Sequence, residues 1–172
     1  PAQIWKNARK NLRVALESGL RFWKCEDETD KIKAYEVIRQ NREERGFPLR
    51  MTWEQVSKTL KFIKADFFLS SNSDKELIAS AIVFHVAKGI VQVVYWGDIP
   101  KYASLKTMNF LSFKVFEYYK SKGIDIVDIG ISTVNSEPNH GLCEFKESIG
   151  CSIQPKYSFS YNTGEIERSN VL

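Results

Sequence analysis

Hydrophobic residues recur along the chain at two different spacings, and each spacing predicts one kind of element. Apolar positions three or four residues apart predict amphipathic helices over 4–18, 30–45, 52–63, 103–121 and 140–149. Thr52 and Asn139 precede two of these stretches and are typical N-cap residues. Gln55 lies three residues after Thr52, so a capping box is predicted at that helix start.

Runs of β-branched and aromatic residues predict strands between the helices. Short polar turns alone separate three of these runs, 66–71, 77–87 and 90–97, which predicts an antiparallel meander. Further strands are predicted over 20–25, 124–130 and 153–161. The last of them would place Tyr157, Phe159 and Tyr161 on one face.

The stretch 103–121 is apolar almost all round, which indicates a helix buried against a sheet. It lies between strands 90–97 and 124–130, so the three form a βαβ unit with parallel strands and a right-handed crossover. The predicted fold is α/β: a mixed sheet in which an antiparallel meander continues into a parallel pair, with helices on both faces. A change of pairing type within a sheet is a common place for a ligand.

Length and composition indicate how many domains the chain forms. The 172 residues are 43% hydrophobic and contain no repeat, low-complexity tract or linker, so residues 1–172 are expected to form one domain. No apolar run approaches the ~18 residues of a membrane helix.

Positive charge is concentrated at the start of the chain. Residues 1–24 contain six bases and one acid, a charge of +5, whereas the whole chain carries +4. Four of the bases share one face of the helix predicted over 4–18: Lys6, Arg9, Lys10 and Arg13. That face is either an ordinary solvated surface or a phosphate-facing edge. The charge is too local for a protein that binds long nucleic acid.

Cysteine and histidine exclude two classes of site. Cys25, Cys143 and Cys151 are an odd number without metal-ligand spacing, which favours packing residues in a reduced, cytoplasmic protein. His85 and His140 lie on different predicted elements, so neither a metal site nor a nucleophile–histidine triad is predicted.

Three short motifs, together with the order of elements, resemble those of a known protein superfamily. The first is Asn-Arg-Glu-Glu-Arg-Gly-Phe-Pro at 41–48, and the second joins Met-Asn-Phe-Leu at 108–111 to Asp-Ile-Gly-Ile-Ser at 128–132. The third is Asn-His-Gly-Leu-Cys-Glu-Phe-Lys-Glu-Ser-Ile-Gly at 139–150. Together they resemble the GNAT superfamily of acyltransferases. Within it they resemble the bacterial Fem-type peptidyl and aminoacyl transferases of peptidoglycan, which carry a Phe-Lys-x-x-Phe-Gly segment.

The resemblance implies an acyl donor, either acetyl-CoA or another acyl-CoA, or an aminoacyl-tRNA. In CoA-dependent GNAT enzymes an Arg/Gln-x-x-Gly-x-Gly/Ala loop holds the pyrophosphate through backbone N–H groups. Here residues 97–105 contain no glycine pair and Pro100 lacks an N–H, so no cofactor is certain and weak CoA binding is expected. Fem-type proteins carry two GNAT-like domains in tandem. This chain best matches the second, which implies a partner domain.

Two residues are candidates for the chemistry. The resemblance places Lys146 near the acyl-ester end of the donor, where a cation would stabilise the oxyanion formed when an amine attacks. The alternative is a solvated lysine that contributes little to packing. Asp128 would take a proton from the amine if burial raised its pKa toward working pH. The alternative is that Asp128, with Ser132, orders the loop that follows.

The remaining candidates would bind substrate. Tyr95 and Trp96 are either aromatic walls beside the acyl group or core residues. Arg42 and Arg45 either hold a phosphate or carboxylate as forks or are exposed helix arginines. Asn109 and Ser132 are candidates because they lie in the two parts of the second motif, 108–111 and 128–132.

These observations favour an acyltransferase that acts on a small-molecule or peptide amine. The resemblance implies direct transfer without a covalent enzyme intermediate. The alternative is a non-catalytic GNAT-like domain that supports a partner domain or protein, which the missing glycine loop favours.

Overall fold

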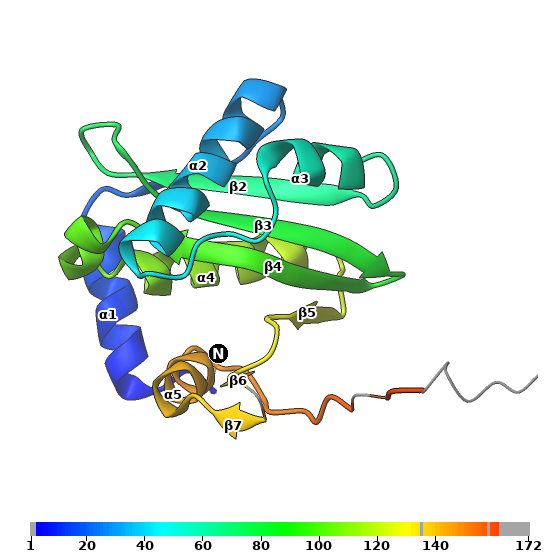
Figure 1. The fold of residues 1–172 in the computed structure, drawn as a ribbon. Helices are drawn as coiled ribbons and strands as arrows, with labels where there is room; N and C mark the ends of the chain where they lie inside the picture. Colours follow the sequence, from blue (N-terminus) through cyan, green and yellow to red (C-terminus); the bar gives the residue numbers. More distant parts are fainter. Residues whose placement is uncertain (1–2, 135, 158, 162–172) are drawn as a thin grey trace, which may run out of the picture.

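A five-stranded sheet lies at the centre of the computed structural model, which describes residues 3–134, 136–157 and 159–161. Its strands lie in the order β1 (Arg21–Lys24), β2 (Ala65–Ser71), β3 (Leu77–Ala87), β4 (Ile90–Asp98) and β5 (Ile126–Asp128) (Figure 1). The α-helices are α1 (Lys6–Glu17), α2 (Glu28–Glu44), α3 (Trp53–Thr59), α4 (Thr107–Ser121) and α5 (His140–Ser148). A 3-10 helix, η1 (Pro100–Leu105), and a small sheet of β6 (Thr133–Val134) and β7 (Glu137–Pro138) complete the elements.

Strand pairing confirms the predicted mixed sheet. β1 to β4 are antiparallel neighbours, and β4 and β5 are parallel and joined through α4. The parallel pairing covers three residue pairs, from Ile90–Ile126 to Gln92–Asp128, although β4 continues to Asp98. Beyond β5 the chain leaves the sheet toward β6, β7 and α5 (Figure 1). The two strands therefore separate soon after they meet.

Helices cover both faces of the sheet, as predicted (Figure 1). α2 and α3 lie on one face, where Ile38 and Val56 share a buried core with Phe67 of β2. α4 lies on the other face, where Leu111 and Val115 pack in a second core. α1 packs on α4 in turn. This sandwich between sheet and helix explains why α4 is apolar almost all round.

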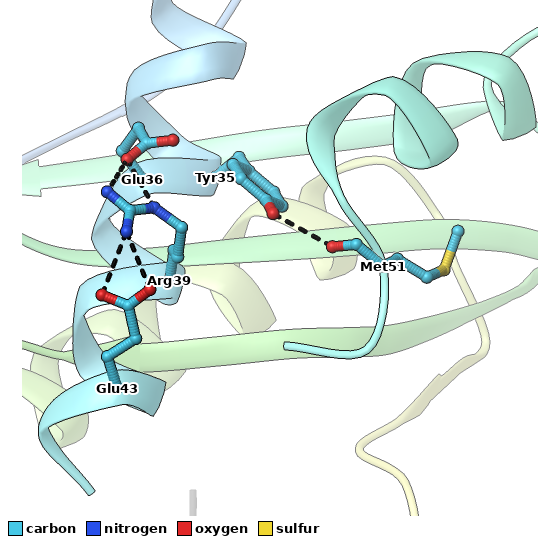
Figure 2. A network of polar contacts seen from close by, with 5 residues as sticks. All are labelled: Tyr35, Glu36, Arg39, Glu43 and Met51. Carbon is cyan, nitrogen blue, oxygen red and sulfur yellow. Dashed lines mark hydrogen bonds and ion pairs between the residues drawn. The ribbon is translucent and has the colours of Figure 1, made fainter. Parts of the chain in front are cut away.

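Side-chain hydrogen bonds hold α2 and the segment that follows it. The hydroxyl of Tyr35 donates to the carbonyl oxygen of Met51 at 3.0 Å, which ties α2 to the entry of α3 (Figure 2). On the exposed face of α2, Arg39 pairs with both Glu36 and Glu43 (Figure 2). Such exposed pairs contribute little to stability, so the buried contacts of α2 decide its position.

The helix starts confirm both predicted caps. Thr52 and Gln55 form the complete capping box at α3. The Asn139 side chain accepts from the backbone N–H of Leu142 at 3.0 Å at the start of α5. At α2 an unpredicted cap, Asp27, starts the helix at Glu28. It therefore begins two residues before the predicted range of 30–45.

Three predicted elements are shorter than expected. The helix predicted over 52–63 ends at Thr59. The helix predicted over 103–121 begins at Thr107, because residues 100–105 form η1 and Lys106 adopts a left-handed backbone conformation with φ of 58°. The strand predicted over 124–130 is only Ile126–Asp128. The chain turns at Gly130, which has φ of +74° and donates its N–H to the Asp128 carboxylate at 2.8 Å.

The strand predicted over 153–161 is wrong for its described residues, 153–157 and 159–161, none of which is in a strand. Tyr157, Phe159 and Tyr161 are 79%, 93% and 77% exposed. Alternating aromatic residues form a strand only where a neighbouring strand supplies hydrogen bonds. The adjacent β5 is only three residues long.

A buried carboxylate joins three strands to α4. Asp66 of β2 is 4% exposed, and its Oδ2 accepts from Tyr119 Oη at 2.9 Å and contacts His85 Nε2 at 2.7 Å. Its Oδ1 lies 3.2 Å from Nζ of Lys24 on β1. Burial alone would raise the pKa of Asp66, but the hydrogen bonds from His85, Tyr119 and Lys24 outweigh it and hold that pKa below its usual value.

We predict that Asp66→Asn destabilises the fold by about 2–4 kcal/mol at pH 7, because three donors lose a buried charged acceptor. Because the pKa of Asp66 is lower in the folded protein than in the unfolded chain, this stabilisation is fully present above the unfolded-chain pKa of about 4. It is lost as the pH falls through the folded-state pKa. Urea unfolding between pH 2.5 and 7 should therefore show the variant and the wild type converging in acid. Exposed Asp74→Asn is the matched control. An equal difference between Asp66→Asn and wild type at every pH would contradict the assignment.

Candidate functional site

A buried carboxylate also marks the end of β4. Asp98 is 5% exposed, and its carboxylate accepts a hydrogen bond from the hydroxyl of Thr107, the first residue of α4. Arg45, just after α2, reaches the same carboxylate at 3.5 Å. The Asn41 side chain of α2 donates to the Asp98 carbonyl oxygen at 2.6 Å. The ends of β4 and α2 and the start of α4 therefore meet at one place.

Gly97 permits this close approach of α2 to β4. A Cβ at this position would lie 2.6 Å from Oδ1 of Asn41, closer than real Cβ atoms come to such a neighbour. The absence of a side chain at Gly97 is what lets the buried Asn41 reach the carbonyl of Asp98.

The loop after β4 occupies the place of the glycine-rich pyrophosphate loop. Ile99 donates its N–H to the Ile78 carbonyl at 2.8 Å, Tyr102 to Ile99 at 2.9 Å and Lys106 to Ala103 at 3.0 Å. Pro100 has no N–H to offer. These groups are already committed within the chain, which supports the expectation of weak CoA binding.

The end of β5 is a second polar cluster. The carboxylate of Asp128 accepts from Gly130 N–H at 2.8 Å, from Gln92 Nε2 of β4 at 3.0 Å and from Lys156 Nζ at 2.5 Å. Burial would raise the pKa of Asp128, but Lys156, Gly130 and Gln92 outweigh it and lower that pKa. The raised pKa expected for a general base is therefore wrong. The contacts match the alternative, in which Asp128 orders the following loop.

Lys146 is not a solvent-edge residue, which corrects the expectation from sequence. It is 7% exposed, and its Nζ donates to the carbonyl oxygens of Gly130 and Ile131 at 2.9 Å each. Desolvation by burial lowers the pKa of its ammonium. Lys146 thus connects α5 to the segment that leaves the sheet after β5, and Gly130 bonds both Lys146 and Asp128.

Tyr95 and Trp96 face opposite sides of β4, as neighbouring strand residues do. Tyr95 packs with the core under α2 and α3. Trp96 packs with the α4 core, and its ring lies edge-on to Phe145 of α5 with centroids 6.3 Å apart. Only Trp96 is therefore on the side where α5 approaches β4.

The predicted site residues fall into two groups. Asp128, Lys146 and Ser132 are gathered around the segment 128–132, where the Ser132 carbonyl accepts from Asn139 N–H at 2.8 Å. Trp96 meets the same helix as Lys146 through Phe145. Arg45 belongs to the cluster at Asp98. Arg42 and Asn109 lie half-buried on α2 and α4, and the buried Nε of Arg42 has no hydrogen-bond partner within the described part of the chain.

Two of the three cysteines are poor nucleophiles. Burial raises the pKa of Cys25 to about 12 and that of Cys151 to about 11, so both thiols stay protonated near neutral pH.

Sequence reasoning did not single out several residues that build the two clusters. Asp98 and Gly97 follow directly on the aromatic residues of a strand, and that position was a signal. Asn41 opens the first motif, but its role depends on how α2 docks, and Thr107 carried no signal because its role depends on how α4 docks. Lys156 was assigned to a strand that is absent.

Neither a family model nor a curated protein matches the sequence. Solved structures do. FemX superposes with a TM-score of 0.70 at 13% identity over 87% of this chain, which spans 54% of FemX. The aminoglycoside acetyltransferase meta-AAC0020, from an uncultured soil metagenomic sample, gives 0.60 at 13% identity over 83% of this chain and 95% of its own.

An acetyltransferase of the GNAT family from Staphylococcus aureus Mu50 has a TM-score of 0.57 at 15% identity, with 88% of this chain and 91% of that one covered. The chain has the GNAT fold. Identities this low establish the fold and nothing finer. In the described ranges no helix is long and apolar enough to cross a membrane.

We predict that Gly97→Ala destabilises the fold by about 1–3 kcal/mol, because the new methyl group displaces Asn41 from the Asp98 carbonyl. Gly141→Ala on α5 is the control, since its Cβ would meet only Asn139 Oδ1 at 3.8 Å. The control should gain up to about 1 kcal/mol from helix propensity. Equal denaturation midpoints for Gly97→Ala and wild type would show that α2 does not need this approach.

CoA is expected to bind with a Kd of about 100 μM or weaker, a free energy of only about −5.5 kcal/mol. The reason is the loop after β4, whose N–H groups are bonded within the chain. Titration calorimetry with CoA and acetyl-CoA measures it directly. A Kd of about 1 μM would contradict the expectation that CoA binds weakly.

Proposed function

We propose that this protein is an acyltransferase that passes an acyl or aminoacyl group from an ester or thioester donor to an amine. The reaction would take place where β4 and β5 separate. The observation that carries the proposal is the buried Lys146, whose ammonium lies at the start of the segment that diverges from β4. The shared GNAT fold supports it, because the solved structures named above include acetyltransferases.

Lys146 has the chemistry to stabilise an oxyanion. Its ammonium has three N–H donors, of which the carbonyls of Gly130 and Ile131 take two. The third has no partner among the described residues and would meet the carbonyl oxygen of the donor as negative charge develops there. Because both bonds fix Nζ in place, the group would be preorganised. Trp96 and Phe145 would form an apolar wall beside the acyl group.

Asp128 suits a binding role. An ionised carboxylate at the end of β5 would attract the protonated amine of the acceptor, a small molecule or a peptide. The amine would lose one proton to solvent before it attacks, and a second proton would pass to the departing alcohol or thiol of the donor as the amide bond forms. The lowered pKa of Asp128 argues against removal of a proton from that amine by its carboxylate. Ser132 would border the site, whereas Tyr95, on the opposite face of β4, would support it only through the core under α2 and α3.

The donor would lie with its acidic groups toward the ends of α2 and α4. Arg42 and Arg45 would pair with phosphate, and Asn109 on the first turn of α4 would assist. The committed N–H groups of the loop after β4 favour an aminoacyl ester, as on a charged tRNA, over CoA. A second GNAT-like domain would complete the acceptor side, since this chain spans about half of FemX.

A non-catalytic role is the second candidate, and specific contacts favour it. Lys146 and Asp128 already bond the backbone of Gly130, and Asp128 is paired with Lys156. Both residues would then only shape the loop of a domain that supports a partner. A thermal-shift comparison of acetyl-CoA, CoA and charged tRNA separates the candidates, because a supporting domain should respond to none of them.

We predict that Lys146→Met lowers the rate of acyl transfer about 10²–10³-fold, the usual loss for one preorganised oxyanion donor. It should also lower stability by about 1–3 kcal/mol, because two carbonyls lose their donor. Transfer assays paired with melting curves measure both effects.

Ser148→Ala is the matched control for Lys146→Met. Ser148 is buried on the same helix, and its hydroxyl donates to the Phe145 carbonyl at 2.7 Å. It should lower the melting temperature while the transfer rate is kept. Equal losses of rate in the two variants would make Lys146 structural and favour the supporting domain.

A further inference from the structure

The helix α1 has a buried side and a charged side. At about 100° per residue, Ala8 and Ala15 fall on one line of the helix, and they are 3% and 0% exposed where α1 packs on α4. Lys6, Arg9, Lys10 and Arg13, which we call the basic face, lie within an arc of roughly 100° on the other side. All four are exposed.

In the part of the chain that the structure describes, the basic face has no carboxylate in ion-pair contact. None of its residues takes part in an ion pair within the described ranges. Residues 1–24 carry +5 in a chain of net +4. From Lys6 to Arg13 the four charges follow the helix axis for about 10 Å. With Trp5 and Asn7, the basic face lines an open hollow of about 880 Å³.

We infer that the basic face of α1 binds the phosphodiester backbone of a nucleic acid, over a footprint of about four phosphates. Cations in a row without acidic partners are the usual surface for such contacts, which release counterions from the nucleic acid. The short footprint agrees with the near-neutral remainder of the chain, which would not hold a long duplex.

Trp5 favours nucleic acid over a simple polyanion. Its indole is 42% exposed and lines the same hollow as the four bases. Aromatic rings beside a cationic track are the surface on which unpaired bases stack. A ring and a row of cations together recognise both parts of a nucleotide strand.

A membrane and an acidic protein fit this surface less well. Helices that insert into a bilayer need one continuous free apolar side. On α1 the buried Ala8 and Ala15 pack on α4, and the exposed Val14 and Leu16 fall on opposite edges of the basic face. The central parts of protein–protein interfaces are poor in lysine, and two of these four bases are lysines. The inference stands apart from the proposed acyl transfer, because α1 contains none of the residues assigned to that reaction.

The test measures fluorescence anisotropy of labelled hairpins, one RNA and one DNA of the same sequence, each with a single-stranded overhang. Between 50 and 200 mM KCl, the logarithm of the binding constant should fall with the logarithm of salt concentration with a slope of about −3 to −4. Replacing the basic face by glutamine (K6Q/R9Q/K10Q/R13Q) should weaken binding by roughly 100-fold or more at low salt and nearly abolish the slope. Glutamine keeps the helix propensity of lysine and arginine, so the melting temperature should hold.

A matched control removes four exposed lysines elsewhere, K61Q/K64Q/K88Q/K120Q, with the same change of net charge. It should keep most of the affinity. Trp5→Leu should weaken binding of the overhang several-fold without changing the salt slope, because stacking releases no counterions. Preference for the RNA or the DNA hairpin would identify the source of the phosphates.

Three results would overturn the inference. The first is an equal loss of affinity in the control and the basic-face variant, which would reduce the effect to net charge. The second is no binding of either hairpin at 50 mM KCl. The third is binding confined to vesicles of phosphatidylcholine with phosphatidylglycerol, which would make the basic face a membrane contact.

Discussion

Two buried aspartates hold α4 on the sheet, and the rest of the structure depends on this attachment. Thr107 at the start of α4 donates to Asp98 at the end of β4, and Tyr119 near its other end donates to Asp66 of β2. Burying a carboxylate costs free energy unless donors compensate it. Here α4 itself supplies one hydrogen-bond donor near each of its ends, so its position relative to the sheet is fixed at both ends. Because α4 connects β4 to β5, its position decides where β5 meets the sheet.

The candidate site follows from how briefly β4 and β5 pair. Three residue pairs join the strands, after which Asp128 draws in the N–H of Gly130 and the chain turns away. Lys146 then bonds the carbonyls of Gly130 and Ile131, and Phe145 of the same helix meets Trp96 of β4. The diverging segment is therefore held by named contacts. The ammonium of Lys146 is thereby held in one place, which the proposed stabilisation of an oxyanion would use.

Much of the fold could be predicted from the sequence, because it depends on local patterns. The meander, the parallel pair, the capping box at Thr52 and the cap at Asn139 follow from periodicity and cap chemistry. The predictions were wrong where a tertiary contact decides the outcome. Lys106 breaks the helix predicted from 103, and the alternating aromatics beyond 153 have no long neighbouring strand to pair with.

The candidate site was predicted less well than the fold, for a physical reason. Lys146 and Asp128 could be proposed as site residues because the motifs contain them. Their burial and the pKa of each side chain depend on neighbours distant in sequence. Lys146 is buried because two carbonyls sixteen and fifteen residues away accept from it. Asp128 has a lowered pKa because Gln92 and Lys156 converge on it. No local pattern specifies such convergence.

The central claim is that the acyl group of the donor lies where β4 and β5 separate. Amide chemical-shift mapping with a non-hydrolysable 3′-aminoacylamino-adenosine tests it most directly, because it locates the ligand without assuming a reaction. The account predicts the largest shifts at residues 94–97 and 130–132, with smaller ones around Arg45 and Asn109. Shifts confined to α1, or saturation binding with no change at 130–132, would contradict it.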